Sequence, residues 1–188
     1  MRCQLIALSL LLAAAAQPGE KSQHPYRSGY VKDTFGKRAA VRVGASAGIQ
    51  QLRNSPHEWG QGASGFGKRV ASGFGQHIIK NSIQYPIAAL RHEELGYRPS
   101  GKKGFGPRLG YALSSTVITH KTTTGQKTLA SGRISGAIAS GFISRAWQPA
   151  RLHTFASGAT SGGIMLGVDA GSNVVREFWP EIRHPHTR

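Results

Sequence analysis

Residues 132–147 read GRISGAIASGFISRAW, and this stretch gives the clearest indication of the fold. Gly132, Gly136, Ser140 and Ser144 recur at intervals of four, which places them on one face of an α-helix. A face without large side chains lets the backbone of another helix approach closely. Because this segment also has the least polar surface of the helical segments, we expect it to form the central helix of a bundle.

The same spacing of small residues recurs in three other segments. These rows are Gly67, Ala71 and Gly75; Gly106, Gly110 and Ser114; and Gly163, Gly167 and Gly171. Each Gly inside a helix costs ~1 kcal/mol relative to Ala, so close tertiary packing must offset the cost of every row. The sequence therefore predicts a mainly α fold, a compact bundle of four to five Gly-rich helices packed through small-xxx-small faces.

Apolar residues run beside the small rows, as Phe66, Val70, Phe74 and Ile78 do, while Lys68, Arg69, Gln76 and Lys80 lie largely elsewhere on the helical wheel. This is the pattern of an amphipathic helix. Two alternatives for the glycine content are loops and the strands of an outer-membrane β-barrel, but barrel strands alternate with a period of two. Tyr85-Pro86 and Trp179-Pro180 are expected to mark segment boundaries.

One part of the chain has the composition of strands. Residues 116–119 and 126–129 are rich in β-branched side chains and flank a turn that contains Gly125. This arrangement predicts one short β-hairpin near 116–129, with a frayed helix end as the alternative.

Composition excludes several classes of protein. The 188 residues include 25 Gly, close to twice the usual ~7%, but only nine Pro and no three-residue Gly period, so the chain is neither collagen-like nor a Pro-rich linker. A hydrophobic content of 39% is too high for a simple polycationic tail. The single Cys, Cys3, excludes a disulfide framework.

The N-terminal residues have the pattern of a secretory signal peptide. Met1-Arg2 is positive, residues 5–16 are an apolar run, and the run ends in four alanines. We expect a signal peptide at 1–16, a flexible basic lead-in at 17–38, a single helical domain at 39–183 and a tail at 184–188. An uncleaved anchoring helix is the alternative for the first segment.

The formal net charge of +16 predicts attraction to anionic surfaces. For an exported protein these are phospholipid headgroups or lipopolysaccharide, and nucleic acid is not the expected partner. The candidate contacts are Lys37, Arg38, Arg42, Lys68, Arg69, Lys102, Lys103 and Arg108. Trp59, Trp147 and Trp179 fall near predicted helix ends. This position suits anchoring at a membrane interface, and it equally suits covering the ends of a hydrophobic core.

The sequence offers no recognisable catalytic, cofactor or metal site. The eight His are dispersed, and His92-Glu93-Glu94 lacks the second His of a zincin helix. Asp169 is better explained by surface polarity or as a partner for a buried Arg than by catalysis, and Glu177 with Glu181 as a solvated helix end. We therefore expect neither an enzyme nor a cofactor.

Several motifs in combination resemble a group of uncharacterised bacterial exported proteins. They are NSPHEWGQG at 54–62, GFGKR at 65–69, GFGPRLGYA at 104–112, GVDAG at 167–171 and EFWPEI at 177–182. The chain departs from that group at residues 94–97, ELGY, where an acidic-Pro-Arg-Tyr stretch is usual. The resemblance implies an envelope protein and brings no catalytic residues with it.

Two functions from different classes follow as expectations. The first is a structural or interaction module of the cell envelope, in the periplasm or at the outer membrane, which associates with a membrane surface and is open to homo-oligomerisation. The second is a soluble periplasmic module that binds polyanions.

Overall fold

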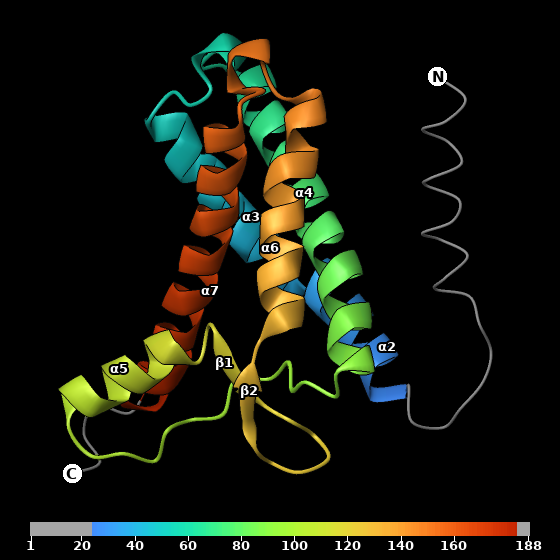
Figure 1. The fold of residues 1–188 in the computed structure, drawn as a ribbon. Coiled ribbons are helices and arrows are strands. Elements are labelled where there is room, and N and C mark those ends of the chain that lie inside the picture. Colours follow the sequence, from blue (N-terminus) through green and yellow to red (C-terminus); the bar gives the residue numbers. More distant parts are fainter. Residues whose placement is uncertain (1–23, 184–188) are drawn as a thin grey trace.

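A computed structural model describes residues 24–183 as a bundle of helices with one small sheet (Figure 1). The long elements are α2 (His24–Phe35), α3 (Lys37–Leu52), α4 (Ala63–Leu90), α5 (Phe105–Ser114), α6 (Ser131–Ile143) and α7 (Phe155–Arg183). Three short 3-10 helices are η1 (His57–Trp59), η2 (Ser144–Trp147) and η3 (Ala150–Leu152). The predicted mainly α fold is confirmed. The predicted signal peptide at 1–16 and the tail at 184–188 lie outside the described residues.

Helix α6 lies between α4 and α7, as Figure 1 shows, and its small row makes the contact with α4. A Cβ added to Gly132 would lie 2.6 Å from the carbonyl oxygen of Gln84, and one added to Gly136 would lie 2.6 Å from that of Lys80. Ser140 is fully buried in the same row and donates its hydroxyl to the carbonyl of Ala137. In the structure α6 is thus the helix between α4 and α7, and its small row faces α4.

The opposite side of α6 approaches α7 through glycines on both helices. A Cβ on Gly141 would lie 2.5 Å from the carbonyl oxygen of Gly158 and 2.5 Å from the amide nitrogen of Gly162. No side chain fits in these positions, so the two backbones set the distance between the helices.

The other three small rows do not pack against helices of the described chain, so that part of the prediction is wrong. Gly67, Gly106, Gly110, Gly163, Gly167 and Gly171 have no atom within 4 Å of an added Cβ, and Ala71 and Ser114 are exposed. Gly75 approaches only the ring of Trp147. The physical reason is rotational: α4 presents Lys80 and Gln84 to α6, and α7 presents Gly158 and Gly162, so the small rows of α4 and α7 face elsewhere.

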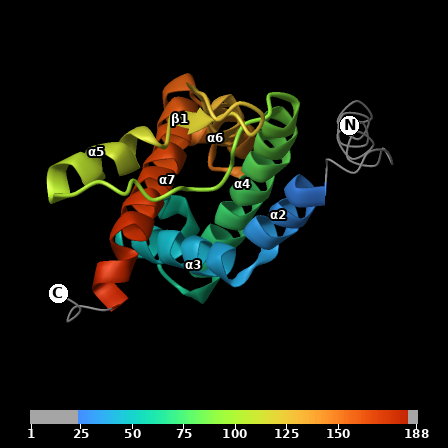
Figure 2. The same cartoon turned by 90° about the horizontal axis from the view of Figure 1, so that it is seen from below.

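Residues 24–38 also differ from the expectation of a flexible lead-in. They form α2 and the start of α3, which run along one side of α4 (Figure 2). Tyr26 donates its hydroxyl to the carbonyl of Glu93, and the ring of Tyr30 meets that of Tyr85 edge to face. These contacts anchor a segment whose own apolar content is low.

Two expected boundaries are wrong for the same reason. Pro86 lies inside α4 and Pro180 inside α7, each close to the C-terminal end of a long helix. Proline removes one backbone donor and disfavours a helical residue before it, but the tertiary contacts of these long helices offset that cost.

The predicted hairpin is confirmed. Strand β1 (Ile118–His120) pairs antiparallel with β2 (Lys127–Leu129), with Thr119 opposite Thr128. Gly125 adopts a positive φ of 69° in the turn, a conformation that favours glycine. Immediately after β2, Ala130 donates its amide to the carbonyl of Val117, and the chain enters α6.

Candidate functional site

The interior of the bundle is polar. Among residues 26–181 the buried apolar side chains are nearly all alanine, with Val43 and Tyr85 as the larger ones. Besides buried Ser and Thr, the buried polar and charged residues include many that are far larger: Arg69, His77, Lys80, Asn81, Gln84, Glu93, Arg133, Arg145, Asp169, Asn173 and Glu177. Buried charges are costly unless they are paired and hydrogen-bonded, so each of them needs a partner.

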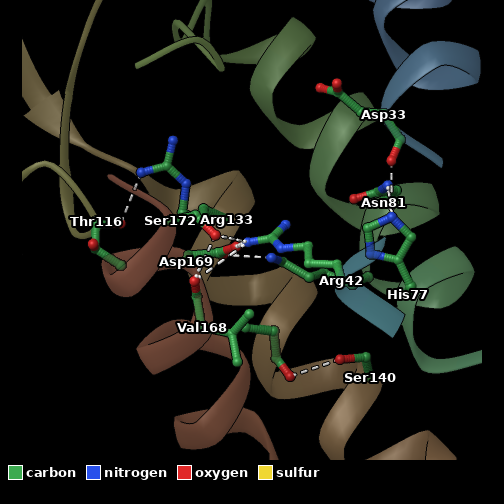
Figure 3. A network of polar contacts seen from close by, with 12 residues as sticks. Asp33, Arg42, His77, Asn81, Thr116, Arg133, Ser140, Val168, Asp169 and Ser172 are labelled. Carbon is green, nitrogen blue, oxygen red and sulfur yellow. Dashed lines mark hydrogen bonds and ion pairs between the residues drawn. The ribbon is translucent and has the colours of Figure 1, made fainter. Parts of the chain in front are cut away.

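Asp169 on α7 is the centre of a polar network inside the bundle (Figure 3). Its carboxylate accepts a hydrogen bond from the ammonium of Lys80 on α4 and, at 2.8 Å, one from the guanidinium of Arg42 on α3. Burial acts to raise the pKa of Asp169, but the charges of Lys80 and Arg42 outweigh burial and lower it. The alternative of surface polarity is wrong, because Asp169 is buried. In place of the expected buried Arg, its partners are the half-buried Arg42 and the buried Lys80, which sequence reasoning missed.

A second part of the network joins α4 to α2. His77 lies 2.8 Å from the carbonyl oxygen of Asp33, and Asn81 donates to the hydroxyl of Thr34 at 3.0 Å (Figure 3). Burial lowers the pKa of His77, so its imidazole is neutral at neutral pH. Tyr85 donates its hydroxyl to the Asp33 carboxylate at 2.7 Å.

Glu177 organises the far end of α7. Its carboxylate accepts hydrogen bonds from the hydroxyl of Tyr97 at 2.6 Å, the amide of Ser100 at 3.0 Å and the guanidinium of Arg108 at 3.1 Å. Burial acts to raise the pKa of Glu177, but these hydrogen bonds outweigh it and lower the pKa to about 2. The expectation of a solvated end at Glu177 and Glu181 is therefore wrong for Glu177, which fastens the 91–104 loop and α5 to α7.

Glu93 closes the N-terminus of α6 from another segment. It is almost fully buried, accepts the amide of Ser131 at 3.2 Å and that of Gly132 at 3.0 Å, and pairs with Arg91. The first amides of a helix have no partner within the helix, and a carboxylate is favourable there. The structure thus gives Glu93 a structural role at the start of α6.

Three of the eight predicted surface cations are committed to internal contacts. Arg69 is fully buried and donates to the carbonyl oxygens of Ser55 at 3.0 Å, Gly60 at 2.7 Å and Pro56 at 2.9 Å. Arg42 is held by Asp169. The prediction that Arg69 and Arg42 contact an anionic surface is wrong. Backbone carbonyl oxygens bind Arg69 inside the fold, and the buried carboxylate of Asp169 binds Arg42.

Arg108 is the third of these cations, because it pairs with Glu177 and Glu181 and lies over the ring of Phe178, 4.4 Å from its centroid. The five remaining candidates are exposed: Lys37, Arg38, Lys68, Lys102 and Lys103.

The outer face of α7 is apolar. Ile164, Val168, Val175 and Trp179 are exposed there, by 61%, 40%, 51% and 46%. With Gly171 between Val168 and Val175, the spacings are four, three, four and four, which makes one continuous stripe that extends for ~22 Å at 1.5 Å per residue. We call these five residues the α7 stripe.

The inner face of the same helix carries Asp169, Asn173 and Glu177. The amphipathic arrangement of α7 is thus the reverse of that of an ordinary surface helix, which buries its apolar face.

Other helices also expose large apolar side chains, among them Val41 and Leu52 on α3, Phe66 on α4 and Ile138 on α6. Trp147 and Trp179 are exposed and Trp59 is half-buried. The helices between residues 24 and 183 include none that combines the length and the apolar character required to cross a membrane.

The described part of the chain holds no group of three or more His, Cys, Asp or Glu side chains that could bind a metal ion. Comparisons with protein-family models, with curated proteins and with solved structures each found no match.

Proposed function

We propose that the protein is an exported envelope module that associates with a membrane surface and acts there as a structural or interaction component. The observation that carries the proposal is the reversal of α7, which keeps Asp169 and Glu177 inside and exposes Ile164, Val168 and Val175. An exposed apolar stripe rimmed by polar residues is typical of a surface that meets a protein or a membrane. The apolar run at 5–16 and the exposed lysines support an envelope location and an anionic partner.

A helix with this arrangement suits a site where one side of the bundle meets acyl chains. The cost of exposing the α7 stripe to water is removed when it enters the boundary between headgroups and acyl chains. Lys37, Arg38, Lys102 and Lys103 supply attraction to anionic headgroups, and this attraction is weakened by salt.

The test is vesicle co-sedimentation of the protein purified from cells, with its N-terminus determined by sequencing. With anionic vesicles we expect binding at low salt and a substantial bound fraction at ~0.5 M salt, where the range of charge attraction is only a few ångströms. The triple variant Ile164→Ser, Val168→Ser, Val175→Ser should lose the salt-resistant fraction and keep its fold, since all three side chains are exposed.

A matched variant separates charge from apolar contact. Replacement of Lys37, Arg38, Lys102 and Lys103 by Gln should weaken binding at low salt and leave the salt-resistant fraction in place. Wild-type binding that disappears at ~0.5 M salt would contradict the membrane proposal and favour the soluble polyanion-binding alternative.

A further inference from the structure

A groove of about 680 Å³ lies along the outer side of α4. Its floor is formed by Ala71 and Gly75, and Trp59 and Trp147 stand beside it. This volume is within the ~300–1,000 Å³ of small-molecule sites. The groove explains two members of a small row that packs against no other α-helix, because larger side chains at Ala71 and Gly75 would fill it.

Trp147 is fixed in position as one wall of the groove. Its indole NH donates to the hydroxyl of Ser72 at 3.0 Å, and its ring lies 3.5 Å from the position that a Cβ on Gly75 would take. Ser72 also accepts a hydrogen bond from Gln76, at 3.4 Å. The Ser72 hydroxyl oxygen and the Trp147 indole NH are therefore already hydrogen-bonded within the protein, and an apolar ligand suits this part of the groove better than a sugar or a nucleotide.

The groove has a charged end and an apolar end. Lys68 lies toward the start of α4, and Ile78 and Ile79 lie about three turns later, ~16 Å along the helix. Among the described residues that line the groove, Lys68 alone is charged and no carboxylate is present. This polarity complements an amphiphile with an anionic head and an apolar chain.

We propose that the groove binds one acyl chain of an anionic phospholipid, with the chain along Ala71 and Gly75 and the phosphate beside Lys68. The inference rests on the proposed membrane association, since the membrane supplies the lipid, and it adds a defined lipid site to that association. Contact between the acyl chain and the ring of Trp147 follows from the geometry and provides a direct optical test.

The experiment measures quenching of tryptophan fluorescence by lysophosphatidylglycerol with a brominated chain, added as monomers below its micelle concentration. The double variant Trp59→Phe, Trp179→Phe keeps Trp147 as the only tryptophan, and the variant Trp59→Phe, Trp147→Phe keeps Trp179. We expect saturable quenching of Trp147 and none of Trp179. Affinity should rise with chain length, by up to about fourfold per CH₂ until the groove is filled.

Two further variants test the site in the Trp147 background. Ala71→Leu, Gly75→Leu should abolish the quenching, whereas Gly106→Leu, Gly110→Leu, the same change in an open row on α5, should not. Lys68→Gln changes one exposed side chain and should weaken binding of the anionic lipid about two- to fivefold, and that of a zwitterionic lysophosphatidylcholine of the same chain by less, because the choline cation offsets the charge of its phosphate.

Quenching that is equal at Trp147 and Trp179, or that persists in Ala71→Leu, Gly75→Leu with its helical circular dichroism intact, would overturn the groove assignment. Because the probe is monomeric, this result is independent of vesicle sedimentation. If the protein binds vesicles and Trp147 is not quenched, the groove assignment alone is refuted. If Trp147 is quenched and the protein does not sediment with vesicles, the proposed membrane association alone is refuted.

Discussion

The carboxylate of Asp169 on α7 accepts a hydrogen bond from the ammonium of Lys80 on α4. Both side chains lie inside the bundle, 10% and 5% exposed. The two residues are 89 positions apart in sequence, and the pair joins α4 to α7. Arg42 from α3 reaches the same carboxylate, so one acid is shared by two bases. Removal of Asp169 and removal of Lys80 should therefore have different effects on stability.

We predict that Asp169→Asn destabilises the protein by ~3–5 kcal/mol, the cost of leaving a buried charge without its partner. Lys80→Met should cost clearly less, because Arg42 still pairs with the carboxylate. Urea unfolding followed by circular dichroism measures both. Arg98→Gln, which breaks the exposed pair with Glu94, is the control and should change stability by less than ~1 kcal/mol. Equal losses at Asp169 and Lys80 would contradict the shared arrangement.

Two glycines from rows with the same four-residue spacing, Gly167 and Gly136, should change stability in opposite directions when replaced by alanine. Gly167→Ala should stabilise the protein by ~0.5–1 kcal/mol, because no atom lies within 4 Å of the new Cβ and alanine favours the helix. Gly136→Ala should destabilise it, because the new Cβ would lie 2.6 Å from the carbonyl oxygen of Lys80. Thermal unfolding of the two single variants decides this, and a gain in stability at Gly136 would refute the close contact of α4 with α6.

The sequence was sufficient to predict the helical class, the hairpin and the central helix. The row that begins at Gly132 could be interpreted because its neighbours are apolar and the segment is buried on two sides. The orientation of α4 and α7 could not be obtained in the same way. Arg69, His77 and Lys80 recur at helical spacing on α4, and such a polar face normally lies in water. Here it lies inside.

The partners of that polar face come from distant parts of the chain. Asp169 is on α7, and the carbonyl oxygens that bind Arg69 are in the loop before α4. A single sequence gives no signal for such pairs. The one available indication was the shortage of large apolar residues on the faces opposite the small rows, which leaves polar side chains to fill the interior.

Stability should decrease at low pH through Glu177. Its pKa is about 2 in the folded protein against an ordinary 4.5, so its contribution is complete above pH ~4.5 and is lost as the pH falls toward 2. A shift of this size corresponds to ~3 kcal/mol. Glu177→Gln should be less stable than wild type at pH 7, and the difference should diminish between pH 4.5 and 2. Urea unfolding at a series of pH values gives the comparison, and a constant difference would contradict the assignment.

Arg69 and Lys68 are neighbours in sequence and should behave as opposites. Arg69→Met removes a fully buried guanidinium from several backbone carbonyl oxygens, and hydrogen bonds to charged groups contribute ~1.5–3 kcal/mol each, so we expect a loss of at least ~3 kcal/mol. Lys68→Gln changes an exposed side chain and should stay within ~0.5 kcal/mol of wild type. Urea unfolding gives the stability of both variants, and vesicle sedimentation below the unfolding transition gives their binding. If Arg69→Met kept its stability and lost only vesicle binding, Arg69 would be a surface contact after all and the packing of residues 53–62 against α4 would be wrong.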